Sequence, residues 1–73
     1  MRRPALTPIQ SSLFDAYHYD PVTSKLTLRF HSGESYVYND VPMEKASTFA
    51  AHSSPGRYYT EHIRDNFLSA KIT

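Results

Sequence analysis

A glycine turn between two alternating stretches is the feature that most constrains what this chain can fold into. Before the turn, apolar and polar residues alternate over residues 25–30, and after it Tyr36 and Tyr38 lie two residues apart. Alternation with a period of two places one set of side chains on one face of a β-strand. Gly33 can adopt the positive φ that a tight reversal needs. Residues 25–30 and 35–39 are therefore predicted to form a β-hairpin.

Residues 11–20 form a further strand candidate, whose alternation is imperfect. Large apolar residues fall on both parities of this stretch. Either both faces of the strand are partly covered, or a β-bulge switches its faces. Asp20 and Pro21 then supply a turn, in which the Asp20 carboxylate can accept hydrogen bonds from backbone amides two residues on. Three consecutive strands joined by short turns predict an antiparallel meander.

Two short helices are predicted after the strands. Pro42 suits a first helical position, and a helix then runs over residues 43–51. Ser54 and Pro55 indicate the start of a second helix, which ends near residue 66. Its buried stripe consists of Tyr59, Ile63 and Phe67. The predicted fold class is α+β, with a three-stranded antiparallel β-meander followed by two short helices packed on one face.

The length of the chain predicts one domain. Seventy-three residues are far fewer than the length at which chains divide into several domains. Residues 1–10 carry prolines and arginines without an apolar pattern, so they are predicted to form a disordered N-terminal arm, and the role of Arg2 and Arg3 in binding stays open. Residues 11–67 make up the single domain, and residues 68–73 are predicted to fray.

Missing residue types exclude several kinds of chemistry. The absence of cysteine excludes disulfides, thiolate zinc sites and thiol nucleophiles. None of the four histidines forms a His-x₃-His pair. The sequence contains neither a nucleophile elbow nor a phosphate-cradling glycine loop. We therefore expect no metal site, no cofactor and no enzymatic activity.

Charge and hydropathy are unremarkable along the chain. The chain has eight basic and seven acidic side chains, so no strong overall electric field attracts nucleic acid or an anionic membrane. No apolar run approaches the roughly 18 residues of a membrane helix. A cytoplasmic protein without a membrane partner is predicted.

Several short motifs, in this order, resemble the KTSC domain family. They are Ser32-Gly33, the Tyr-x-Tyr of Tyr36 and Tyr38, Val41-Pro42 and Ser54-x-Gly56-Arg57-Tyr58. The resemblance covers residues 11–67, and the ordered combination is more specific than any one motif. The family takes its name from a module at the C-terminus of some lysyl-tRNA synthetases, and it also occurs as small stand-alone bacterial and phage-type proteins. The resemblance therefore implies a stand-alone member with RNA as a candidate partner.

Three positions depart from the family pattern. His18 stands where a glycine often precedes the tyrosine, Thr60 where asparagine is frequent, and Asp65 where a small or basic residue is common. Thr60 lacks an amide that could bond to a base, and Asp65 lowers the local positive charge. Both changes weaken the RNA site that the resemblance implies, because they remove a possible contact to a base and lower the positive charge.

Aromatic and arginine side chains are the candidate contacts for nucleic acid. Tyr36 and Tyr38 either stack on bases or belong to the core, because alternating aromatics suit both roles. Tyr58 lies off the buried stripe and is predicted to be exposed. At the start of the second helix, arginines either contact phosphates or are solvated beside an ordinary helix cap. The candidate nucleic-acid-binding residues are Arg29, Tyr36, Tyr38, Arg57, Tyr58 and Arg64.

Two classes of function stay open. The first is a small non-enzymatic module that binds RNA or another nucleic acid through the aromatic and arginine side chains. The second is a protein-interaction module that uses the exposed sheet face or a sheet edge. Phosphate contacts weaken with salt, whereas an aromatic protein interface does not. No small-molecule substrate is inferred.

Overall fold

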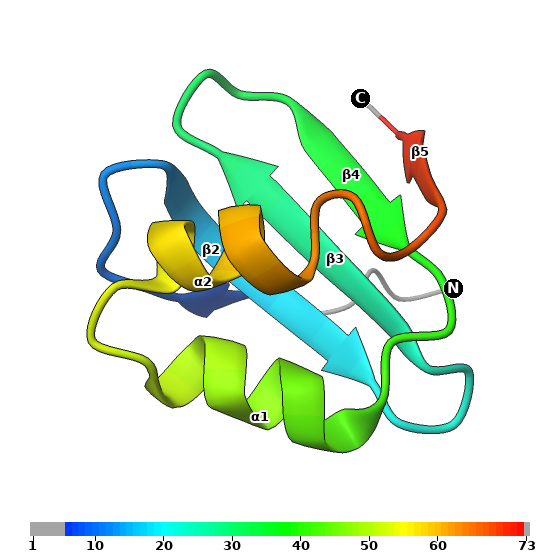
Figure 1. Ribbon diagram of the computed structural model, residues 1–73. Helices are drawn as coiled ribbons and strands as arrows, with labels where there is room; N and C mark the ends of the chain where they lie inside the picture. The colour runs from blue at the N-terminus through cyan, green and yellow to red at the C-terminus, as the bar shows by residue number, and fades with distance from the viewer. Residues whose placement is uncertain (1–5, 73) are drawn as a thin grey trace.

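An antiparallel sheet of five strands, with two helices on one of its faces, forms the described part of the chain (Figure 1). The computed structural model describes residues 6–72; residues 1–5, with the two arginines of the predicted arm, and Thr73 lie outside this range. None of the helices within it has the length and apolar character needed to span a bilayer. The elements are β1 (Thr7–Pro8), β2 (Phe14–Asp20), β3 (Lys25–Phe30), β4 (Ser35–Tyr38), α1 (Met43–Ala51), α2 (Pro55–His62) and β5 (Ser69–Lys71).

The predicted hairpin is formed by β3 and β4. Leu28 lies opposite Tyr36 in the ladder. Across the turn, the Phe30 amide donates to the Glu34 carbonyl at 2.9 Å. Gly33 has a φ of 96°, in the region where a residue with a Cβ is strained. This glycine therefore fixes where the chain reverses.

A β-bulge explains the imperfect alternation of the first predicted strand. The register between β2 and β3 shifts at Asp15. Phe14 before the bulge and Tyr17 after it therefore point to the same face of the sheet, although their positions differ in parity. Both rings contact Phe49 of α1, with centroid distances of 5.5 and 5.9 Å. Of the two interpretations that the sequence left open, the structure contains the bulge.

The turn between β2 and β3 is closed by the carboxylate that the sequence indicated. Asp20 Oδ1 accepts a hydrogen bond from the Val22 amide at 2.9 Å. This bond to the charged form lowers the pKa of the Asp20 carboxyl below its usual value. Ser24, with a φ of 59°, completes the reversal into β3.

The core lies between the sheet and the two helices. Its large, fully buried side chains are Phe14, Leu26, Leu28, Val41, Phe49 and Ile63. They come from β2, β3, both helical regions and the link between β4 and α1. That link is anchored to the sheet because the Tyr19 hydroxyl donates to the Val41 carbonyl at 2.6 Å.

The prediction of three strands was wrong, because the sheet has five. β1 pairs with β2 and β5 pairs with β4, so residues assigned to the arm and to the fraying tail contribute both edges of the sheet. Around β5, the Asn39 amide donates to the Leu68 carbonyl, and the Ile72 amide to the Ser35 carbonyl, each at 2.9 Å. Backbone pairing holds these strands of two and three residues, which are too short for side-chain alternation to reveal.

Both helices form close to their predicted positions. α1 occupies the predicted residues, with Pro42 at the N-cap instead of inside the first turn. α2 starts at Pro55 as predicted but ends at His62, about one turn before the predicted end. The chain leaves α2 at Ile63, whose fully buried side chain closes the core. It then returns alongside β4 as β5.

We expect Ile63→Ala to lower the free energy of unfolding by about 2–5 kcal/mol, because the change removes buried methyl groups and leaves a cavity. Urea denaturation followed by far-UV circular dichroism measures the loss. Val22→Ala is the control, since Val22 is 90% exposed and its truncation should cost less than about 0.5 kcal/mol. Equal losses in the two variants would contradict the placement of the core.

Candidate nucleic-acid interface

A groove of about 570 Å³ lies between the segment that precedes β2 and the start of α2. One wall consists of residues 10–13, and the other of residues 53–57 with Thr60. Arg57 is the charged residue of this lining, and the hydroxyl groups include those of four serines, Ser11, Ser12, Ser53 and Ser54. Hydroxyls, backbone amides and guanidinium groups are the usual contacts of phosphate oxygens. The lining therefore suits a phosphate group.

The wall before β2 is held in place by the β3–β4 turn. The His31 Nε2 donates to the Ser11 carbonyl at 2.7 Å, and the His31 amide donates to the Leu13 carbonyl at 3.1 Å. Within the wall, the Ser11 hydroxyl accepts a hydrogen bond from the Leu13 amide at 3.1 Å. These bonds give a segment without regular structure a defined position.

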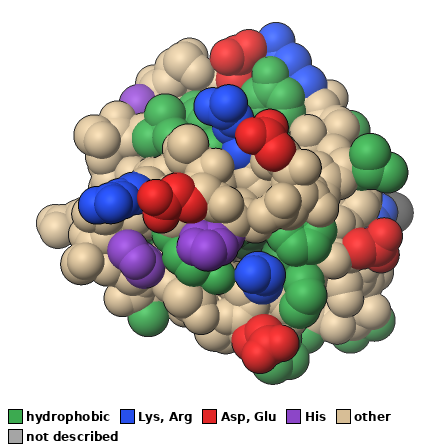
Figure 2. All heavy atoms as spheres, viewed as in Figure 1, with side chains coloured by type: hydrophobic (Ala, Val, Ile, Leu, Met, Phe, Trp, Pro, Cys, Tyr) green, Lys and Arg blue, Asp and Glu red, His purple; other side chains and the backbone are tan. Residues whose placement is uncertain are grey.

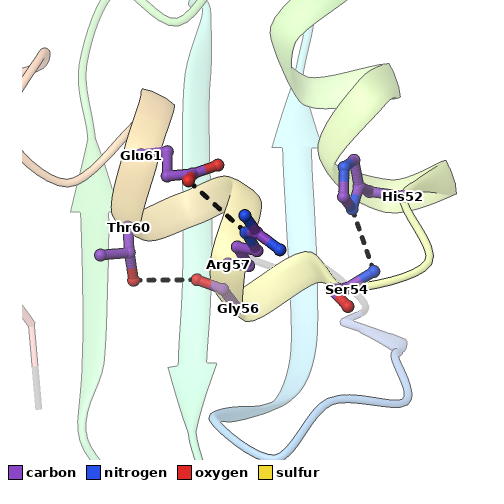
Figure 3. A network of polar contacts seen from close by, with 6 residues as sticks. All are labelled: His52, Ser54, Gly56, Arg57, Thr60 and Glu61. Atoms are coloured by element: carbon purple, nitrogen blue, oxygen red, sulfur yellow. Dashed lines mark hydrogen bonds and ion pairs between the residues drawn. The ribbon is translucent and has the colours of Figure 1, made fainter.

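The wall at the start of α2 is a helix terminus with a polar network around it (Figure 3). Ser54 occupies the N-cap position, as predicted, but its hydroxyl does not cap the helix. Its amide donates instead to His52 Nδ1 at 3.0 Å, while the Thr60 hydroxyl donates to the Gly56 carbonyl at 2.9 Å. The first amides of a helix have no acceptor within the helix. Gly56 and Arg57, which carry two of these amides, both line the groove.

Arg57 is exposed and only loosely paired. Its Nε lies 3.5 Å from Glu61 Oε2, one helical turn further on, and its side chain is 75% exposed (Figure 3). An exposed pair at this spacing contributes little to stability. A phosphate in the groove would therefore compete with Glu61 for this guanidinium.

The other two arginine candidates lie away from the groove. Arg64 follows the C-cap of α2, outside the lining of the groove, and lies 3.7 Å from the Asp65 carboxylate. Arg29 alternates with the buried Leu28 on β3, so it lies on the sheet face turned away from the helices. There it pairs with the Asp15 carboxylate at 2.6 Å. The structure places Arg29 on the opposite side of the sheet from α2, and of the three arginines only Arg57 lines the groove.

The Tyr-x-Tyr strand faces the helices. Tyr38 is 3% exposed, and its hydroxyl is hydrogen-bonded to the hydroxyl of Tyr59. Burial, reinforced by this bond, raises the pKa of Tyr59. Tyr36 is half-buried and packs its ring against Phe30, 5.7 Å between centroids. Of the two roles left open, Tyr38 has the core role, and its ring is not available to a base.

Tyr58 was predicted to be exposed, and this prediction was wrong. Its side chain is 9% exposed and belongs to the core cluster. The two tyrosines of α2 point in directions about 100° apart. Tyr59 meets the sheet, while Tyr58 lines a small surface pocket together with Lys45 and Thr48 of α1. The predicted stripe of Tyr59, Ile63 and Phe67 packs in or against the core, and Tyr58 is buried in addition because α2 packs against α1 as well as the sheet.

Positive and negative side chains are interspersed on the face that carries the helices. Figure 2 shows most Lys and Arg side chains of this face next to Asp or Glu side chains, with no continuous basic patch. At the sheet edge, Lys71 pairs with Glu34 at 2.7 Å. The hydrogen bond from Lys71 lowers the pKa of the Glu34 carboxyl. A nucleic acid on this face would therefore contact individual basic side chains and not a continuous basic surface.

Sequence reasoning missed the serines of the groove and two histidines beside Tyr58. His52 and His62 contact the Tyr58 ring at centroid distances of 5.4 and 4.7 Å. The paired serines of residues 11–12 and 53–54 are a visible signal, but nothing in the sequence says that these segments meet. Within residues 6–72, no three His, Cys, Asp or Glu side chains are grouped so that they could hold a metal ion.

Comparisons with known proteins agree on one family. The family model described as KTSC domain matches residues 10–67. A crystal structure of a KTSC domain protein from Yersinia pestis superposes with a TM-score of 0.92 at 30% identity, covering 97% of this chain and 100% of that chain. A protein of Tsukamurella paurometabola is 36% identical over 67 residues, which are 92% of this chain and 100% of that protein.

Two further relatives are much longer. A lysine–tRNA ligase of Nostoc sp. is 38% identical over 70 residues, and one of Trichormus variabilis is 33% identical over 70 residues. In each case the match covers 96% of this chain and 12% of the ligase. This chain therefore spans about an eighth of the length of these relatives.

We expect Tyr38→Phe and Tyr59→Phe each to lower the free energy of unfolding by about 1–3 kcal/mol, because each leaves a buried hydroxyl without its partner. The double variant removes both hydroxyls and should lose less than the sum of the two single changes. Chemical denaturation of the four proteins gives the coupling energy. Additive losses would show that the two hydroxyls do not stabilise each other.

Proposed function

We propose that this chain, which belongs to the KTSC domain family, is a non-enzymatic RNA-binding module that holds an RNA phosphate in the groove at the start of α2. The observation that carries the proposal is the match of 96% of the chain to a segment of lysine–tRNA ligases, proteins whose name makes transfer RNA a substrate. The groove supplies a place for the contact. Its serines, its helix amides and Arg57 are all donors to phosphate oxygens.

The proposed contact is limited in strength by the charge around it. Arg57 shares its charge with Glu61, and the whole chain has a formal net charge of +1. With one or two phosphates contacted, the affinity for single-stranded RNA should fall about three- to sevenfold between 50 and 200 mM salt. A steep salt dependence would require a basic patch.

A protein-interaction module is the second candidate. The sheet face opposite the helices carries no helix in the described part of the chain (Figure 1). Beside the edge strand β5, Leu68 and Ile72 are 82% and 52% exposed, and apolar side chains at an open strand edge favour pairing with another chain. Binding of a protein there should be insensitive to salt over the same range.

Arg57→Ala should weaken RNA binding about five- to tenfold at 50 mM salt and reduce the salt slope for single-stranded RNA by about 0.7, because one phosphate contact is lost. Fluorescence anisotropy with a labelled transfer-RNA mixture and a labelled single-stranded RNA measures both quantities. Circular dichroism checks that the exposed side chain was removed without unfolding.

Lys25→Ala is the matched control for this measurement. Lys25 is an exposed residue of β3, so its loss changes the net charge equally without touching the groove. Equal affinities for wild type and Arg57→Ala would remove the groove from the proposal. The absence of RNA binding at 50 mM salt would overturn the proposal as a whole.

Glu61→Gln should strengthen RNA binding about two- to fourfold at 50 mM salt, because it removes the carboxylate that competes for Arg57. The same anisotropy titration measures the gain. Glu34→Gln makes the same change of charge at the β4–β5 edge, next to Lys71, and should leave the affinity nearly unchanged. A decrease in affinity for Glu61→Gln would contradict competition at the guanidinium.

A further inference from the structure

Three aromatic rings form a tilted stack where the end of α1 meets α2. The Tyr58 ring contacts both histidines, with the His62 ring at 4.7 Å and 31° and the His52 ring at 5.4 Å and 37°. These centroid distances lie in the range of offset stacking. Tyr58 is buried, whereas both histidines are exposed. Figure 2 shows two histidine side chains close together on the face that carries the helices.

The two imidazoles are held in place from different elements. His52 is the C-cap residue of α1, and its Nδ1 accepts a hydrogen bond from the Ser54 amide. His62 ends α2, one turn after Tyr58, so its ring lies over the tyrosine. Since Tyr58 is fixed by the core, the exposed rings rest on a rigid support. Stacking on such rings costs little ordering of the protein.

The stack adjoins the groove. Ser54 lines the groove and bonds to the ring of His52, and His62 directly follows Glu61, the residue paired with Arg57. A nucleotide whose phosphate lies at Arg57 therefore has aromatic rings next to it. The π-face of a base is free for such stacking only when the base is unpaired.

We infer that His52 and His62, backed by Tyr58, form a stacking platform for an unpaired base, so that the RNA bound at the groove is single-stranded. This inference rests on the RNA-binding function proposed above and specifies its substrate. Stacking uses the flat face of an aromatic ring, so the phenyl ring of a His62→Phe variant can replace the imidazole. The platform distinguishes unpaired RNA from a duplex and from a bare polyanion.

Anisotropy titrations at 50 mM salt test the inference, with a labelled single-stranded RNA of ten nucleotides, a duplex carrying the same number of phosphates per strand, and inorganic polyphosphate as competitor. We expect His62→Ala to weaken single-strand binding about tenfold, in line with the loss of one base–aromatic stack. His62→Phe should retain the affinity, which a structural hydrogen bond or a charge on the imidazole would not allow.

His18→Ala is the matched control, because His18 lies on β2 opposite Thr27, on the sheet face turned away from the helices. It should bind like the wild type. In an NMR titration, the ring protons of His62 should shift upfield as a base stacks, while those of His18 stay in place.

The outcomes separate the two proposals. Single-strand binding that is unchanged in His62→Ala, or duplex binding as tight as single-strand binding, overturns the platform and leaves RNA binding intact. Loss of affinity in both His62→Ala and His62→Phe also overturns it, since the ring face is then not what matters. No binding of either RNA overturns the proposed function, and the platform with it.

Discussion

The ring of Phe14 on β2 contacts the sheet and both helices, so it links the three parts of the structure that enclose the core. Its centroid lies 4.7 Å from Phe30 of β3, 5.5 Å from Phe49 of α1 and 5.0 Å from Tyr59 of α2. A domain of this size has little apolar area to bury, so a few aromatic contacts decide how the helices sit on the sheet. Both walls of the groove are attached to this cluster. Leu13 precedes Phe14 in one wall, and the first turn of α2 leads to Tyr59 in the other.

Most of the motif residues that mark the family are structural. Gly33 forms the hairpin turn, Tyr38 and Val41 are buried, and Pro42 is the N-cap of α1. The run from Ser54 to Arg57 differs from these, since it lines a groove. The motifs therefore identify the fold, and one of them also contributes to the candidate site.

Elements with a local signal could be predicted from the sequence, and contacts between distant segments could not. The alternation of residues 25–30 and the helix signals at Pro42 and Pro55 each lie within a few residues, and the structure contains β3, α1 and α2 at these places. The edge strand β5 depends on a partner far away in the chain, and β1 consists of two residues, too few to show an alternation. The groove depends on contact between residues 10–13 and 53–57, which are far apart in the chain. Because the bulge in β2 moves every later side chain of the strand to the other face, its position decides which residues of β2 meet the helices.

The pattern of charges limits how this surface could hold the RNA proposed as its partner. Arg29, Arg57 and Arg64 each have a carboxylate between 2.6 and 3.7 Å away, so a phosphate would have to displace an existing partner at each of them. The resulting gain in free energy is small, because one exposed pair replaces another. Helix amides and ring faces carry no such competitor. The first amides of α2 and the ring faces of His52 and His62 are therefore where the proposed RNA would gain free energy without displacing an ion pair, and of these only the ring faces would contact a base.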